Sequence, residues 1–128
     1  MVREVISAPD APQAMGAYSP AIKAGNLLFV SGQIPIDPAS GALIDGDIAA
    51  QTEQVMRNLG ALLRAAGAGF EHVVRTNVFL ADMGDFATVN AIYAEAFGDH
   101  RPARSTIQAA ALPANALVEI EAWAYVGP

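Results

Sequence analysis

The sequence predicts an α/β domain of the two-layer (α+β) kind, in which two helices cover one face of a mixed sheet. Three observations indicate this class. The chain has 128 residues and is 53% hydrophobic, which suits one domain over residues 1–128 with an ample core. Two segments repeat apolar residues at helical spacing, and the segments around them favour strands. Their order is a hairpin, a helix, a strand, a helix and two strands.

The first half of the chain predicts the hairpin and a long helix. Residues 21–33 hold two short β-prone runs around Gly25-Asn26, a sequence typical of a tight turn. A helix then follows from Asp47, a candidate N-cap, to Gly67, a candidate stop. Its apolar stripe consists of Val55, Leu59, Leu62, Leu63 and Ala66.

The second half predicts a strand, a helix and two closing strands. Residues 72–81 are β-branched and aromatic enough for a buried strand. Asp82 is a candidate cap for the second helix, which Gly98 ends. That helix repeats Phe86, Val89, Tyr93, Ala96 and Phe97. Residues 103–110 and 117–126 form the last strands, joined by a turn at LPAN.

Alternation along the strands predicts one face under the helices and one without cover. In the last strand, one face consists of Val118, Ile120, Ala122, Ala124 and Val126, and the opposite face consists of Glu119, Glu121, Trp123 and Tyr125. In the strand at 72–81, Arg75, Asn77 and Phe79 lie opposite Val74, Thr76, Val78 and Leu80. Because two helices cover only one side, Phe79, Trp123 and Tyr125 would face water unless another subunit covers them. We therefore predict a homo-oligomer.

Composition excludes several classes of function. With 7 basic and 13 acidic residues the net charge is −6, which repels nucleic acid. There is no cysteine, and His72 and His100 lie outside ligand spacing, so we expect no metal site. The apolar runs are too short for a bilayer span or a signal peptide, so we expect a cytoplasmic protein with no membrane partner.

Arg104 is the most informative candidate site residue. It alternates with Thr106 and Gln108 on one strand face, in a stretch without acidic residues. A guanidinium needs an anion, and two sources remain open. Arg104 either pairs with Glu119 or Glu121 inside the sheet, or offers its two parallel donors to a carboxylate ligand.

Glu119 and Glu121 are a second candidate pair, since they share a strand face two residues apart. If both are buried, one can hold a raised pKa that suits general acid or base chemistry; a solvated or arginine-bound pair is the ordinary alternative. Tyr18, Ser31 and Asn90 are single polar residues that serve either the structure or a ligand.

Together these segments resemble the RidA/YjgF-like reactive-intermediate deaminases, also known as the endoribonuclease L-PSP or translation-inhibitor family. The resemblance covers nearly the whole chain and is carried by GAYSPAI, LLFVSGQIPIDPASG, VVRTNVFLADMGDFATVNAIYAEAF, PARSTIQAAALP and VEIEAWA. The PARS segment followed by LP and VEIEA is its most specific part.

The resemblance implies a chorismate-mutase-like fold and a homotrimer in which the sheets line a central β-barrel and the active sites lie in clefts between subunits. It also implies an activity. Archetypal members hydrolyse small-molecule 2-imino acids, 2-iminobutanoate and 2-iminopropanoate, to 2-oxo acids and ammonia without a cofactor.

The resemblance further assigns roles to individual positions. Arg104 takes the place of the carboxylate-binding arginine, and Glu119 that of the acid that positions the attacking water. Tyr18, Ser31, Gly32 and Asn90 fall on the other substrate-binding positions. Thr106 stands where the archetype has cysteine, so the preference for the imine side chain is expected to differ if that side chain touches substrate.

Imine hydrolysis in a cleft faced by both Arg104 and Glu119 is thus the leading hypothesis. A module that binds small carboxylates or a partner without turnover would need Arg104 but not Glu119. RNA cleavage, named in the family's other title, is disfavoured by the acidic charge and by the lack of a histidine pair for acid and base work.

Overall fold

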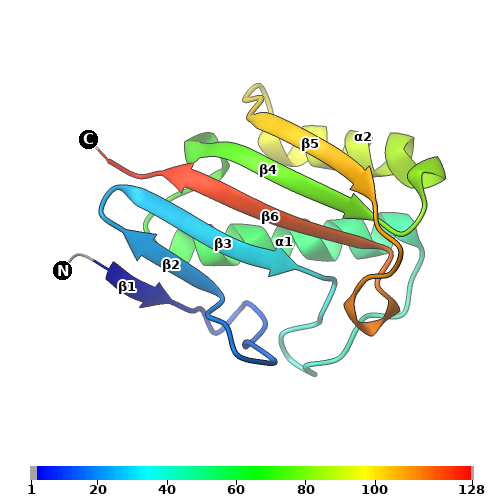
Figure 1. Ribbon diagram of the computed structural model, residues 1–128, viewed down its shortest axis with the longest axis horizontal. Coiled ribbons are helices and arrows are strands. Elements are labelled where there is room, and N and C mark those ends of the chain that lie inside the picture. The colour runs from blue at the N-terminus through cyan, green and yellow to red at the C-terminus, as the bar shows by residue number, and fades with distance from the viewer. Residues whose placement is uncertain (1–2, 128) are drawn as a thin grey trace.

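The structure, a computed structural model, describes residues 3–127 as a six-stranded mixed sheet with two helices on one face (Figure 1). The two-layer prediction is confirmed. The strands are β1 Arg3–Ile6, β2 Ala21–Ala24, β3 Leu27–Gln33, β4 Val73–Leu80, β5 Ala103–Gln108 and β6 Val118–Tyr125. The helices are α1 Ile48–Ala65 and α2 Phe86–Phe97. Among the described residues, no helix is both long and apolar enough to cross a membrane.

The strand order in the sheet is β1-β2-β3-β6-β4-β5. All pairings are antiparallel except that of β4 with β5, which α2 connects as a crossover. The predicted count of five strands is wrong because β1 was missed. This strand has only four residues, three of them exposed, and it forms through edge pairing with β2, so its own sequence carries little apolar alternation.

The ends of the helices follow local hydrogen bonding. Asp47 caps α1 as predicted, its Oδ1 accepting from the Ala50 N–H at 2.9 Å. Gly67 follows the helix with φ +77°, a conformation that favours glycine. Asp82, however, does not cap α2. Its Oδ1 accepts from the Gly84 N–H at 2.8 Å and so caps a short 3-10 turn, and α2 begins only at Phe86.

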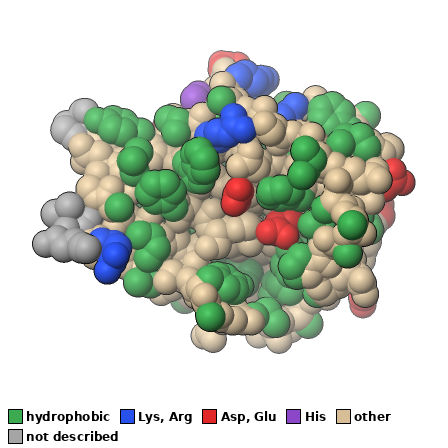
Figure 2. All heavy atoms as spheres, viewed as in Figure 1, with side chains coloured by type: hydrophobic (Ala, Val, Ile, Leu, Met, Phe, Trp, Pro, Cys, Tyr) green, Lys and Arg blue, Asp and Glu red, His purple; other side chains and the backbone are tan. Residues whose placement is uncertain are grey.

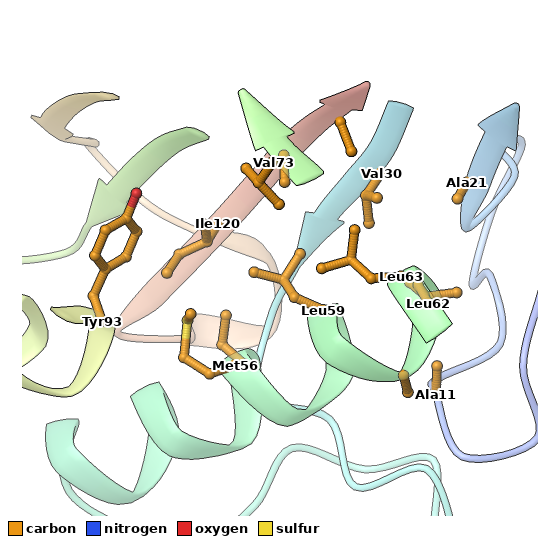
Figure 3. Close-up of a cluster of buried hydrophobic side chains, with 14 of the residues drawn as sticks. Ala11, Ala21, Val30, Met56, Leu59, Leu62, Leu63, Val73, Tyr93 and Ile120 are labelled. Carbon is orange, nitrogen blue, oxygen red and sulfur yellow. The ribbon is translucent and has the colours of Figure 1, made fainter. Parts of the chain in front are cut away.

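The core lies between α1 and the central strands. Figure 3 shows Leu59 and Leu63 of α1 directed toward the strands that carry Val30 and Ile120, while Leu62 extends toward the side of Ala21. All of these leucines, with Val30 and Ile120, are at most 2% exposed. The predicted inward set of β6 is buried as expected from Val118 to Ala124. This packing fixes which face of each central strand is turned away from the helices.

Val74 is an exception to the predicted alternation. It is exposed, and Val73 is buried in its place. The pairing of β4 with β6 shifts register between Val73 and Arg75, which is a β-bulge that places an extra residue at the start of β4. From Arg75 onward the predicted faces are correct.

Among residues 3–127, no helix covers the sheet face that lies away from α1 and α2. Figure 2 shows hydrophobic side chains gathered over this face, with acidic and basic groups among them. Phe29, Trp123 and Tyr125 are 40%, 40% and 45% exposed, and the first two meet edge to face with ring centroids 6.3 Å apart. Phe79 is half-buried rather than open. A contiguous apolar area of this kind is typical of a surface that another protein chain covers.

Candidate active site

One candidate site is a cavity of about 610 Å³ on the open face of the sheet. It lies where β3 ends, β6 begins and the segment before β2 passes by. Four predicted site residues line it together, along with Glu121. These residues are Tyr18, Ser31, Gly32 and Glu119.

Gly32 and Glu119 are in close contact inside this cavity. A Cβ built on Gly32 would overlap the Glu119 carboxylate, so any larger residue at position 32 would displace that carboxylate. The pairing of β3 with β6 shifts register between Val30 and Gln33, which places Gly32 in the irregular stretch. The absence of a side chain at Gly32 therefore leaves the space that the Glu119 carboxylate occupies.

The environment of Glu119 favours its protonated form. Burial of this half-exposed carboxyl raises its pKa above the ordinary 4.5, and the nearby Glu121 raises it further. Glu121 Oε1 accepts a hydrogen bond from Asn77 Nδ2 at 2.9 Å. A carboxyl group whose pKa is raised in this way is better suited to accepting and returning a proton than an ordinary solvent-exposed glutamate.

Tyr18 and Ser31 form the wall of the same cavity. Ser31 Oγ donates to the Ser19 carbonyl at 2.6 Å, which ties β3 to the preceding loop. Tyr18 is 52% exposed, and its hydroxyl accepts from the Met15 N–H at 3.2 Å. Both groups therefore order the loop, and both residues also line the cavity.

Arg104 lies in a second, smaller cavity of about 420 Å³, between β5 and α2. Its Nη1 donates to Asn90 Oδ1 at 2.8 Å. The guanidinium carbon stands 5.4 Å from the centre of the Phe86 ring and 4.9 Å from that of Tyr93. Such cation–π contacts hold a guanidinium in a fixed orientation without neutralising it.

Arg104 and Glu119 lie on opposite faces of the sheet. Thr76 of β4 is in register with both Arg104 and the buried Ala122, so Arg104 points to the helix side. Glu119 is three residues from Ala122, and alternation turns it to the open side. Within one chain, Arg104 and Glu119 therefore do not face a common cleft. The alternative of an ion pair of Arg104 with Glu119 or Glu121 is wrong, since no described carboxylate lies within 4.0 Å of the guanidinium.

Thr106 shares the helix-side face of β5 with Arg104, as predicted. Its Oγ1 is buried and has no hydrogen-bond partner among the described residues. Gln108, next on the same face, accepts from the Met83 N–H at 2.8 Å and so serves the loop before α2. Of Arg104, Thr106 and Gln108, only Thr106 therefore has a side-chain polar atom without a hydrogen bond to another described residue.

Sequence analysis missed the aromatic support of Arg104. Phe86, Asn90 and Tyr93 are spaced i, i+4 and i+7 and so share one face of α2, a signal that was available. The two aromatics were assigned only to the core because they fit the apolar stripe. Within residues 3–127, no three or more His, Cys, Asp or Glu side chains lie together so that they could hold a metal ion.

We predict that Tyr93→Phe lowers stability but leaves the Arg104 platform in place. The Tyr93 hydroxyl lies 2.6 Å from Thr76 Oγ1 in a fully buried position, and burial raises the pKa of this tyrosine. Without it the Thr76 hydroxyl is left unpaired, at a cost of about 1–3 kcal/mol in the free energy of unfolding. Urea denaturation measures the loss. The same change in a Thr76→Val background should cost clearly less, and an equal cost would contradict the pairing.

Known proteins resemble this chain along its whole length. Residues 8–126 match the endoribonuclease L-PSP family. The chain is 51% identical over 124 residues to a RutC family protein of Pyrococcus horikoshii, covering 97% of this chain and 98% of the relative. It is 49% identical over 128 residues to the 2-iminobutanoate/2-iminopropanoate deaminase of Rattus norvegicus, covering 100% and 93%.

Solved structures agree with these relatives. YyfA of Yersinia pestis, a member of the conserved Rid protein family, superposes with a TM-score of 0.94 at 46% identity, covering 97% of this chain and 99% of the other. E. coli TdcF with bound serine gives 0.92 at 35% identity, covering 97% and 99%. The chain therefore belongs to the endoribonuclease L-PSP family, the family of the Rid and RutC proteins.

Proposed function

We propose that this protein hydrolyses small 2-imino acids, such as 2-iminobutanoate and 2-iminopropanoate, to 2-oxo acids and ammonia. The observation that carries the proposal is Arg104, a guanidinium held by Asn90 and two aromatic rings yet without a carboxylate partner among the described residues. Such a group is ready to bind a substrate carboxylate through two parallel hydrogen bonds. Two kinds of relative support this reading: deaminases named for these substrates, and a TdcF structure with bound serine, which also carries a carboxylate.

We further propose that each active site is built from two copies of the chain. One copy supplies Arg104 and Asn90 from the edge of its sheet, and the next supplies Glu119, Tyr18, Ser31 and Gly32 from its open face. This arrangement reconciles the opposite directions of Arg104 and Glu119 in a single chain. It also gives the exposed Phe29, Trp123 and Tyr125 a covering partner, in keeping with the homotrimer expected for the family.

The reaction follows from these positions without a cofactor. Arg104 holds the carboxylate of the substrate in its iminium form. Glu119 takes a proton from water while the water oxygen bonds to the imine carbon and the C=N electron pair moves to nitrogen. Glu119 then gives that proton to the nitrogen. The C–N bond breaks as the C=O bond forms, and the hydroxyl proton passes through Glu119 to ammonia, which leaves as ammonium.

Glu119→Gln tests this function. We expect kcat for imine hydrolysis to fall about 10²- to 10⁴-fold, because the amide can neither accept nor return the proton, while KM changes little. Imines generated in situ by a dehydratase serve as substrate, and ammonia and 2-oxo acid release are followed together. Glu95→Gln on the exposed side of α2 is the charge-matched control.

Two outcomes of that assay would reject the proposal. A folded Glu119→Gln protein as fast as wild type would remove Glu119 from the chemistry. A wild-type protein that binds 2-oxo acids through Arg104 but never exceeds the uncatalysed rate would identify a carboxylate-binding module.

A further inference from the structure

A row of hydrogen-bonded polar side chains crosses the open face of the sheet. Arg75 Nη2 donates to Ser105 Oγ at 2.7 Å and to Asn77 Oδ1 at 3.2 Å. Asn77 Nδ2 in turn donates to Glu121 Oε1 at 2.9 Å. The row connects β5, β4 and β6, and it lies on a face whose other large side chains, such as Phe29 and Trp123, are apolar.

The register of the sheet explains why these residues meet. Asn77 is directly opposite Ser105 on β5 and directly opposite Glu121 on β6. It therefore stands between the two neighbouring strands, with Arg75 two residues before it on the same face. Polar groups in such positions are costly on a face that a partner covers unless they are bonded to one another.

The two ends of the Asn77 amide are fixed by different neighbours. The guanidinium of Arg75 can only donate, so it selects the amide oxygen. The amide nitrogen is then turned to Glu121, whose carboxylate accepts from it. Arg75 and Glu121 are thus linked through the Asn77 amide, and the polarised amide stabilises the Glu121 carboxylate. Among the described residues the two side chains form no direct ion pair.

Glu121 and Glu119 line the same cavity. The only other titratable side chain lining that cavity is Tyr18, and the remaining lining from β3, including Gly32 and Gln33, is uncharged. Under the proposed function, Arg104 of a second copy faces the same cavity from outside the chain. Among the described residues that line the cavity, Glu121 is therefore the one acidic side chain besides Glu119.

We propose that Glu121, held by Asn77 and Arg75, is a positioning residue for Glu119. The negative charge of Glu121 lets Glu119 retain the proton after Glu119 takes it from water and before Glu119 gives it to nitrogen. This inference rests on the proposed function for the reaction it serves. The raised pKa of Glu119, to which Glu121 contributes after burial, agrees with it. Glu121 itself touches no reacting atom and so is not a catalytic residue.

The direct test is a carboxyl titration that requires no turnover. With ¹³C-labelled glutamate, the midpoint of the Glu119 carboxyl is measured by NMR in wild type, Glu121→Gln and Asn77→Ala. Removal of a neighbouring negative charge favours the ionised form, so the Glu119 midpoint should move to lower pH in Glu121→Gln. Asn77→Ala releases Glu121 toward solvent, so it should give a smaller move in the same direction.

The kinetic counterpart is the pH profile of kcat/KM. Because the unprotonated Glu119 starts the reaction, its lower midpoint should move the acid limb of the kcat/KM profile to lower pH in Glu121→Gln, which raises the ratio of kcat/KM on that limb to its plateau value. Glu95→Gln removes the same charge from the exposed side of α2 and should leave both the midpoint and the ratio unchanged.

The outcomes distinguish the positioning role of Glu121 from the proposed deaminase function. A Glu119 midpoint that stays in place in folded Glu121→Gln overturns the positioning role, even if the protein is an active deaminase. A midpoint that moves in a protein without deaminase activity keeps the coupling of the two carboxylates and rejects only the reaction assigned to it. A loss of stability alone, with no shift of midpoint or ratio, means that the row is purely structural.

Discussion

Arg104→Ala should lower kcat/KM for 2-imino acid hydrolysis by roughly 30- to 4,000-fold while the protein stays folded. Loss of one partner of a desolvated, hydrogen-bonded charge pair costs about 2–5 kcal/mol, and each 1.4 kcal/mol is a factor of ten. Here the lost partner is the Arg104 guanidinium, and the substrate carboxylate would be left unpaired. The fold should survive, because Arg104 is only half-buried and its one side-chain hydrogen bond to another described residue is to Asn90.

Two further variants make this test specific. Arg104→Lys keeps the charge but not the planar pair of donors, so its kcat/KM should fall between those of Arg104→Ala and wild type. Arg57→Ala, on the exposed side of α1, removes the same charge from the helix layer and should have no effect. Folded Arg104→Ala protein that works at the wild-type rate would end the assignment of a carboxylate clamp.

The sequence predicts the composition of each half of the candidate site. Alternation places Glu119 on the open face, the resemblance places Ser31 in a pocket with it, and the two residues do line one cavity. Asn90 and Arg104 also meet as the resemblance implies. These relations depend on strand periodicity and on motifs within single elements, both of which a sequence displays.

The sequence does not predict how the two halves are arranged. Whether Arg104 and Glu119 share a face depends on how β5 pairs with β4 and how β4 pairs with β6, and bulges such as the one at Val73–Arg75 change the count of residues by one. A shift of one residue turns every side chain of a strand to the other face. Strand register is a tertiary property, so residue spacing alone could not supply it.

Close contacts are likewise invisible in the sequence. Nothing around Gly32 distinguishes it from a turn glycine until the Glu119 carboxylate is found where its Cβ would be. Similarly, Arg75 and Asn77 are correctly predicted to share a face with Glu121, but their hydrogen bonds require the actual pairing of three strands.

Activity should return when two inactive variants are assembled together. If each site takes Arg104 from one copy and Glu119 from its neighbour, a mixed assembly of Arg104→Ala and Glu119→Gln chains contains some sites with both native residues. Random assembly from equal amounts makes about a quarter of the sites complete, for any closed ring of identical subunits. Co-refolded protein should therefore show about a quarter of the wild-type kcat per site, far above either variant alone.

The matched control replaces the Glu119→Gln chains by chains that carry both substitutions. No combination of these with Arg104→Ala chains contains a native Arg104, so their mixture should stay inactive. If both residues of a site came from the same chain, neither mixture would recover, since every chain lacks at least one of them. Recovery in the first mixture alone therefore identifies a site shared between copies, and its absence in a mixed assembly of confirmed composition would contradict the opposite-face geometry as the basis of the active site.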